Sequence, residues 1–347
     1  MEIIKDFKST NKKGEYKFVR CKLQKKYNCN HCYINEILKT NIKIIILILF
    51  IFIIISFEIL RNIYKKLNIK DDKIKEHICL DKYETNIYEE IREKLLNNQC
   101  SQMWANQREF LNGVIRYFKP KKIVEIGVAE GGGTSIILNA IQDIENSHLY
   151  SIDLSDSPNI GKCAKNLFPQ FLNKWTLFTG NVAAKFMEQI GNNIDMVFID
   201  SAHFEPGEIL DFIIVLPFLK EGAIVGFHDI ANQMNNNIKQ RNEWAPYIIF
   251  NIIRGIPYYP SGKIFLKHDI GIKVLNQNQK QYYHDYFRAL GGQWQYFPKE
   301  SHIKLINELF QKYYDIKCRK MFQETVEFNR IFVKNNPMNQ IYGYNSD

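Results

Sequence analysis

The sequence lacks several motifs that would assign its class at once. Its glycine-rich stretch does not have the Gly-x-Gly-x-x-Gly spacing of a dinucleotide fingerprint. No Asp-x-Asp motif for a sugar nucleotide is present, since Asp153 and Asp156 are three positions apart, which argues against a membrane-anchored glycosyltransferase. There is no internal repeat and, despite abundant asparagine, no Asn-x-Ser/Thr sequon. These absences leave a globular enzyme or binding protein of another class.

A regular cysteine framework is also missing. The chain has seven cysteines, an odd number, and their scattered positions do not predict a set of disulfides. The Cys29-Asn-His-Cys32 group could hold zinc or carry a lipid, but no second pair of matching spacing accompanies it. The cysteines are Cys21, Cys29, Cys32, Cys79, Cys100, Cys163 and Cys318.

Positive charge is concentrated at the beginning of the chain. Residues 1–75 carry 17 Lys and Arg against 7 Asp and Glu, and the totals of 46 and 37 leave 29 against 30 for residues 76–347. A protein that acts on nucleic acid should carry its basic surface on the domain that holds the substrate. We therefore expect no nucleic-acid partner.

The chain contains one long apolar run. Residues 44–57 hold no charge, and the segment 42–60 is long enough to span a bilayer if Lys43 and Glu58 snorkel. A cleaved signal peptide does not fit, because 43 residues precede the uncharged run and no small-residue cleavage site follows it. The sequence thus predicts a single-pass membrane protein with one transmembrane helix at 42–60.

The flanks of this helix favour one orientation. Six basic residues lie in the 15 positions after Leu60, against four in the nearest 20 on the other side, which places the C-terminal part in the cytosol. We expect residues 1–41 to form a disordered basic tail and residues 61–76 to form a charged linker.

The most informative segment is 122–134, where an apolar strand runs into a glycine-rich turn before a helix. Glycine permits positive φ and a close approach of the backbone, and the helix N-terminus offers free N–H groups. The carboxylate of Glu125 would repel a pyrophosphate and attract an ammonium group. We expect a small polar ligand here.

Three strand ends in this order resemble the class I S-adenosylmethionine-dependent methyltransferases, over residues 102–275. The resemblance implies that Asp153, which ends the strand 148–153, accepts hydrogen bonds from the ribose of the cofactor. It also implies that Asn181, which follows the strand 175–179, lies near the adenine ring. In the family an acid and glycines face the methionine half, and these are here Glu125, Gly127, Gly131 and Gly132.

The next motifs resemble a subfamily that includes macrocin O-methyltransferases and cephalosporin hydroxylase-like proteins. Asp200 ends a fourth apolar strand, His203 follows it, and His228-Asp229 ends the fifth strand. In related catechol O-methyltransferases the corresponding strand ends hold a metal. The resemblance therefore makes Asp200, His228 and Asp229 candidate ligands of Mg²⁺ or another divalent cation, with Asp200 also near the cofactor. A His-Asp pair departs from the usual Asp-Asp or Asp-Asn and shifts the preference toward Mn²⁺, Fe²⁺ or Zn²⁺.

Two interpretations of these residues stay open. His203 could be the catalytic base that removes a hydroxyl proton beside Asp200, or a loop histidine bonded to Asp200. Likewise, Asp229 could cap the next helix and His228 could pack beneath the cofactor. The residues permit a metal without requiring one, and Asp211 is expected to be structural.

The pattern of elements predicts the fold class. Helices alternate with strands up to residue 229, as in a doubly wound, mostly parallel α/β sheet, and residues 263–275 predict a closing antiparallel pair. The resemblance implies seven strands in a Rossmann-like methyltransferase domain at 77–275. Residues 276–347 predict a C-terminal helical extension that packs on the domain or on a second subunit.

The sequence favours a membrane-anchored O-methyltransferase that acts on a hydroxyl of a small molecule or sugar. The alternative from another class is a cofactor-binding scaffold without turnover, which the retention of acids at the strand ends disfavours.

Overall fold

The computed structural model describes residues 79–100, 103–231, 243–261, 269–276 and 278–336. Contacts divide the chain into residues 1–76 and 77–347, and every described residue belongs to the second unit. The predicted tail (1–41), transmembrane helix (42–60) and linker (61–76) therefore lie outside the described residues. Within the described ranges, no helix is both long and apolar enough to cross a membrane.

A seven-stranded sheet forms the centre of the described unit, with the order β3-β2-β1-β4-β5-β7-β6. The first five strands are parallel, and β7 runs antiparallel to both β5 and β6. The predicted α/β sheet is thus confirmed. The strands are β1 (Lys122–Ile126), β2 (His148–Asp153), β3 (Trp175–Thr179), β4 (Ile194–Ile199), β5 (Leu219–His228), β6 (Gly255–Tyr258) and β7 (Ile270–Leu275).

The closing pair differs from the expectation for 263–275. Only Ile270–Leu275 of that segment forms a strand, and its partner β6 comes earlier in the chain, while residues 262–268 lie outside the described ranges. The reason is that β7 inserts between β5 and β6, so that Ile272 faces Gly226 on one side and Tyr258 on the other.

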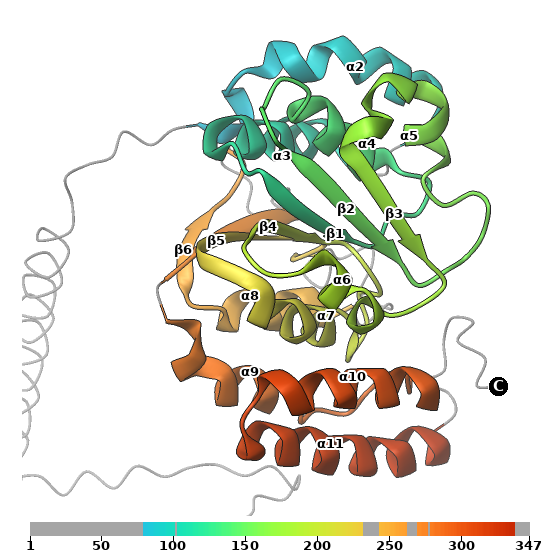
Figure 1. Cartoon of the computed structure of the whole chain (residues 1–347), viewed down its shortest axis with the longest axis vertical. Coiled ribbons are helices and arrows are strands. Elements are labelled where there is room, and N and C mark those ends of the chain that lie inside the picture. The colour runs from blue at the N-terminus through green and yellow to red at the C-terminus, as the bar shows by residue number, and fades with distance from the viewer. Residues whose placement is uncertain (1–78, 101–102, 232–242, 262–268, 277, 337–347) are drawn as a thin grey trace, which may run out of the picture. The chain divides into compact units, whose positions relative to one another are not determined.

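Helices cover both faces of the sheet (Figure 1). Helices α2 to α5 lie on one face and α6 to α8 on the other. Along β4, Met196 and Phe198 belong to the hydrophobic cluster that includes residues of α2 to α4, whereas Val197 and Ile199 belong to the cluster that includes residues of α7 and α8. Alternating side chains of a strand point to opposite faces, which explains why strands buried on both sides are continuously apolar. The helices are α2 (Thr85–Asn97), α3 (Ala105–Phe118), α4 (Gly132–Ala140), α5 (Lys162–Leu167), α6 (Met187–Ile190), α7 (Gly207–Val215) and α8 (Ala245–Ile252).

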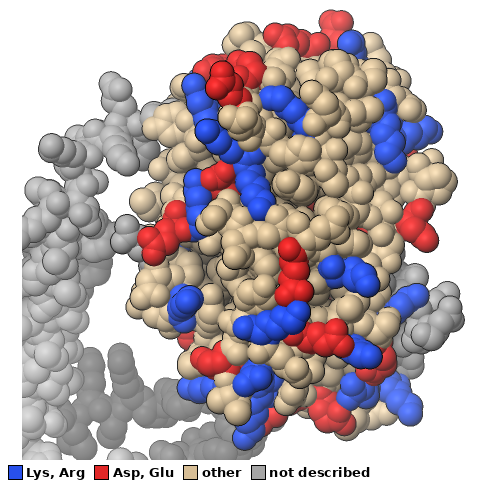
Figure 2. Space-filling model, viewed as in Figure 1, with Lys and Arg blue, Asp and Glu red and all other residues tan. Residues whose placement is uncertain are grey.

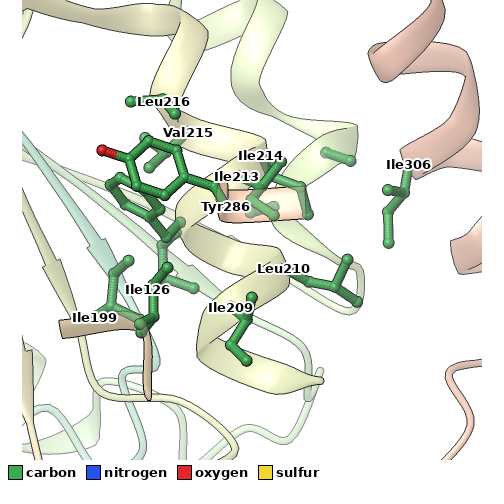
Figure 3. Close-up of a cluster of buried hydrophobic side chains, with 14 of the residues drawn as sticks. Ile126, Ile199, Ile209, Leu210, Ile213, Ile214, Val215, Leu216, Tyr286 and Ile306 are labelled. Carbon is green, nitrogen blue, oxygen red and sulfur yellow. The ribbon is translucent and has the colours of Figure 1, made fainter. Parts of the chain in front are cut away.

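The C-terminal extension packs on the α7 side of the domain. Its buried aromatic residues, such as Tyr286 and Phe310, belong to the same hydrophobic cluster as α7 and α8. Figure 3 shows Tyr286 beside Ile213 and Val215 of α7. The extension consists of α9 (Tyr283–Ala289), α10 (Glu300–Tyr313) and α11 (Ile316–Asn335), and short 3₁₀ turns occur at Leu80–Lys82, Pro169–Lys174, Ala183–Lys185, Leu216–Phe218 and Gln279–Tyr282.

One disulfide contradicts the expectation drawn from the cysteine pattern. Cys100 and Cys163 are bonded, with Cα atoms 5.9 Å apart. They are 63 positions apart in sequence, and α2 and α5 both pack against α4, which brings them together. The spacing of the cysteines in the sequence therefore could not predict this pairing.

The surface of the described unit mixes both signs of charge. On the face in Figure 2, Lys and Arg side chains are interspersed with Asp and Glu, and other residues cover most of the area. This agrees with the near balance of 29 basic and 30 acidic residues counted for residues 76–347.

Candidate functional site

A cavity of about 370 Å³ lies at the carboxyl ends of β1 to β4. Open parallel sheets bind ligands at this edge, because the loops that follow the strands converge there. The lining comes from the loop after each of these four strands, from α7, and from the segment before α10 with the first turns of α10 in the C-terminal extension.

The glycine-rich turn after β1 forms one wall of the cavity. Gly127 has φ +89°, and a Cβ atom there would come within 1.9 Å of the backbone oxygen of Asp200. Glycine is thus required for the close approach of the β4 loop. Gly127 lines the cavity as predicted.

Gly131 and Gly132 lie behind this wall, outside the cavity lining. Gly131 precedes α4 with φ +91°, and a Cβ there would lie 2.9 Å from the Cα of Gly161. Gly132 is buried in the first turn of α4. These glycines serve the packing of two turns against each other, and their contact with a cofactor stays a prediction.

Glu125 lies beneath the turn and is only 1% exposed. Its Oε2 accepts hydrogen bonds from the hydroxyls of Ser151 (2.6 Å) and Thr134 (2.8 Å). Burial raises the pKa of Glu125 to about 8, against the opposing effect of these two hydrogen bonds. Glu125 does not line the cavity, and its contact with a cofactor stays a prediction.

Asp153 holds the turn in place from β2. Its Oδ2 accepts hydrogen bonds from the backbone N–H groups of Val128 (2.9 Å) and Ala129 (3.0 Å), and Oδ1 accepts one from Ser155 (2.9 Å). Asp153 also lines the cavity. Each carboxylate oxygen has two lone pairs, so the same group can still accept hydrogen bonds from a ligand.

Asn181 lies on the opposite side of the cavity, after β3. Its side-chain oxygen accepts a hydrogen bond from the N–H of Val182 at 3.0 Å, which fixes the turn into the 3₁₀ segment Ala183–Lys185. Both residues line the cavity.

A polar cluster joins the ends of β4 and β5. His228 Nδ1 lies 3.4 Å from Asp200 Oδ1 and 3.3 Å from Asp229 Oδ2. His203 Nε2 lies 3.1 Å from Asp229 Oδ2 and 4.0 Å from Asp200 Oδ1. The four residues singled out from the sequence are therefore brought together, with Asp200 shared between the cluster and the cavity.

Two buried side chains complete the cluster, and sequence reasoning missed both. Glu208, fully buried, accepts the backbone N–H of His203 at 2.5 Å and lies 3.2 Å from its Nδ1. Gln107 on α3 contacts His228 Nε2 through its side-chain oxygen at 3.2 Å. An acid in the first turn of the apolar helix α7 could have drawn attention to Glu208. Gln107 is 121 positions from His228 and gave no signal.

The charges of the cluster compensate one another. Burial alone would lower the pKa of His203, but the carboxylates of Glu208, Asp229 and Asp200 raise it to about 10. The pKa of His228 is likewise raised by Asp200 and Asp229 against burial. Two protonated imidazole groups would thus offset part of the negative charge of the three carboxylates. The pKa of His203 is thus well above the ordinary value of about 6.5 for histidine.

Asp229 belongs to a second pair of acids. Burial would raise its pKa, yet the charge of His228 dominates and lowers it to about 2. Its neighbour Asp269, after the undescribed residues 262–268, has a pKa raised to about 6 by burial and by the charge of Asp229. Asp269 Oδ1 also accepts the N–H of Ala231 at 2.6 Å.

The donor set of this cluster fits a divalent cation. Asp200, His203 and Asp229 can each offer one ligand atom, and these atoms lie within 4.8 Å of one another. Two carboxylates and one imidazole suit Mn²⁺, Fe²⁺ or Zn²⁺ better than Mg²⁺. The histidine in this group is His203, whereas the sequence pointed to His228.

Comparison with known proteins finds one family model that matches part of the chain. The model of a family described as a methyltransferase domain matches residues 124–230, a segment that contains the strand-end residues of the site. No curated protein matches the chain.

Solved structures are similar at low identity. An O-methyltransferase from Bacillus cereus in complex with SAH has 15% identity and a TM-score of 0.42, and the match covers 60% of this chain and 96% of that one. The O-methyltransferase TomG from Streptomyces achromogenes, in complex with SAM, has 15% identity and a TM-score of 0.41, with 60% and 95% covered.

Proposed function

We propose that the chain is an S-adenosylmethionine-dependent O-methyltransferase that acts on a hydroxyl group of a small molecule or sugar. The observation that carries the proposal is the cavity at the ends of β1 to β4, because the strand-end loops and the α7 residues that line it all lie within the segment matched as a methyltransferase domain. The resemblance of its motifs to the macrocin O-methyltransferase subfamily supports an oxygen atom as the atom that is methylated.

The residues of the cavity fit the cofactor. Asp153 and Asn181 would bind its nucleoside half, and Gly127 would adjoin the methionine half, with Asp200 between the cofactor and the polar cluster. When bound, S-adenosylmethionine supplies an electrophilic methyl group. The protein contributes alignment, exclusion of water and control of one proton.

The polar cluster would hold the acceptor. A hydroxyl group placed next to Asp200 lies beside His203, whose Nε2 is the candidate acceptor of its proton. His203 carries its own proton near neutral pH in the described arrangement and must lose it first. As an alternative to a histidine base, a divalent cation on Asp200, His203 and Asp229 would lower the pKa of a bound hydroxyl. In that arrangement His203 is a ligand of the cation and does not accept the proton.

Attachment to a membrane through residues 42–60 is part of the proposal. The charge bias around this segment favours a cytosolic domain, whereas the disulfide Cys100–Cys163 is typical of an oxidising compartment. The state of these two thiols in the cell distinguishes the two orientations.

Calorimetry on the purified full chain in mild detergent tests the cofactor. We expect binding of S-adenosylmethionine and S-adenosylhomocysteine, and at least about tenfold weaker binding for Asp153→Ala, which removes charge-assisted hydrogen bonds. Asp156→Ala removes an exposed acid from the same loop and should leave affinity unchanged. If a folded Asp153→Ala variant binds both ligands as tightly as the wild-type chain does, Asp153 does not bind the ribose. Methyl transfer to a panel of hydroxyl acceptors then separates an enzyme from a scaffold.

A further inference from the structure

The C-terminal extension supplies the outer wall of the cavity. Its lining residues are Tyr296, Phe297, Pro298, Lys299, His302 and Ile306, together with Glu300. These positions lie beyond residue 230, where the matched methyltransferase domain ends. Figure 3 shows Ile306 of α10 opposite Leu210 and Ile214 of α7, and all three line the cavity.

The segment before this wall is fixed from two sides. On the domain side, the N–H of Gln295 donates to the backbone oxygen of Glu205 at 2.9 Å, and the Gln295 side chain accepts the N–H of Glu205 at 3.0 Å. On the other side, Asn329 of α11, which is fully buried, accepts the N–H of Trp294 at 2.8 Å and donates to Gly292 at 3.1 Å. The wall is thus held by hydrogen bonds to both the domain and α11.

Phe297 is one of the aromatic side chains in this wall, next to Tyr296. The guanidinium of Arg330 lies 5.5 Å from the centre of its ring, and the ring of Trp294 lies 5.8 Å away. Arg330 is itself held by Glu300 at 2.8 Å. The Phe297 ring is therefore supported by α11, and it lines the cavity.

The wall lies at the nucleoside end of the cavity. Helix α10 packs against the 3₁₀ turn Ala183–Lys185, which directly follows Asn181 and Val182, and against α7. Under the proposed function, Asn181 and Asp153 bind the nucleoside half of the cofactor. A base bound there would lie between the β3 loop and the extension.

Resting on the proposed function, we infer that Phe297 of the C-terminal extension forms the surface against which the purine base of the cofactor lies, with Arg330 as a positioning residue behind it. The extension would then be a part of the cofactor site. Contact between a base and an aromatic ring contributes about 1–3 kcal/mol, or about 5- to 150-fold in affinity.

Calorimetry with two ligands tests this inference on the full chain. S-adenosylhomocysteine contains the base, and S-ribosylhomocysteine lacks it. We expect Phe297→Ala and Phe297→Leu to weaken S-adenosylhomocysteine at least fivefold and to leave S-ribosylhomocysteine within twofold. The leucine variant keeps an apolar side chain of moderate size and guards against a loss of folding, which thermal melting monitors.

Phe328→Ala is the matched control, because Phe328 lies on α11 and is 52% exposed. It should change neither affinity. If the Phe297 variants bind S-adenosylhomocysteine as tightly as the wild-type chain does, the inference is overturned. It is also overturned if the variants bind both ligands more weakly by the same factor, because Phe297 would then only maintain the shape of the pocket. Absence of S-adenosylhomocysteine binding by the wild-type chain would instead refute the proposed function and this inference with it.

Discussion

Thr134 donates a hydrogen bond of 2.8 Å to the carboxyl group of Glu125, directly beneath the glycine-rich turn. The contact joins the first turn of α4 to the end of β1, and Ser151 adds a bond from β2. Glu125, which the sequence predicts to face a ligand, thus connects β1, β2 and α4 through hydrogen bonds. Its burial has a measurable consequence.

The free energy of unfolding should fall as the pH rises through the pKa of Glu125. The folded pKa is raised from 4.5 to about 8, so the folded state binds more protons than the unfolded state between these values. Stability from this group is complete below about pH 4.5 and is lost toward pH 8, by an amount on the order of a few kcal/mol. Glu125→Gln should flatten this dependence in urea denaturation at pH 6 and pH 9.

Glu130→Gln is the control for this experiment, since Glu130 is an exposed acid in the same turn. It should keep the wild-type slope. A Glu125→Gln variant with the same pH dependence as the wild type would show that Glu125 is ionised in the folded protein.

Loss of the disulfide should destabilise the domain. Cys100 and Cys163 are 63 positions apart, and closing a loop of that size contributes up to about 4 kcal/mol by the chain-entropy estimate. We expect Cys100→Ser/Cys163→Ser to lower the unfolding free energy by a large part of that amount, whereas Cys79→Ser, at an exposed free cysteine, should not.

Thiol labelling at the moment of cell lysis reports on the same disulfide bond. We expect Cys100 and Cys163 to be blocked until reductant is added. Immediate labelling of both would contradict the disulfide and would favour the cytosolic orientation indicated by the basic residues after Leu60.

The polar cluster should bind Mn²⁺. Titration calorimetry of the full chain should show one site that is weakened at least about tenfold in Asp200→Asn and Asp229→Asn, because each loses a negatively charged ligand. Binding should strengthen as the pH rises, since a metal competes with protons for His203.

Asp285→Asn, at a partly exposed acid paired with Arg288 on α9, is the matched control and should bind Mn²⁺ like the wild type. No heat of binding up to millimolar Mn²⁺ would remove the cation from the proposal. Protonated His203 and His228 would then be the groups that offset the charges of Asp200 and Asp229.

The segment 42–60 should anchor the chain in a membrane. We expect the full chain to stay in the membrane fraction after alkaline carbonate extraction. The double substitution Ile48→Lys/Ile53→Lys should release the chain, because inserting each lysine near the centre of a membrane span costs about 2.5–3.5 kcal/mol. Asn62→Lys, outside the run, should have no effect. Release of the wild-type chain by carbonate would show that the segment lies on the surface of the membrane.

The sequence by itself determined the alternation of strands and helices and the residues at the strand ends. Apolar runs that end in Asp153 and Asp200 are local signals, because a strand buried on both faces needs a continuous apolar run and ends where polar loops begin. From parallel strands it follows that Asp200, His228 and Asp229 lie at one edge of the sheet, and they do.

Only the tertiary structure decided what these residues face. The burial of Glu125 against Thr134 and Ser151 depends on how α4 and β2 pack on β1, and the raised pKa of His203 depends on Glu208 and Asp229. The pairing of Cys100 with Cys163 and the Phe297 wall join segments that are far apart in the chain. Periodicity and turn residues specify local conformation, whereas burial, ionisation and the walls of a cavity depend on contacts between distant segments, which form only when the whole domain packs.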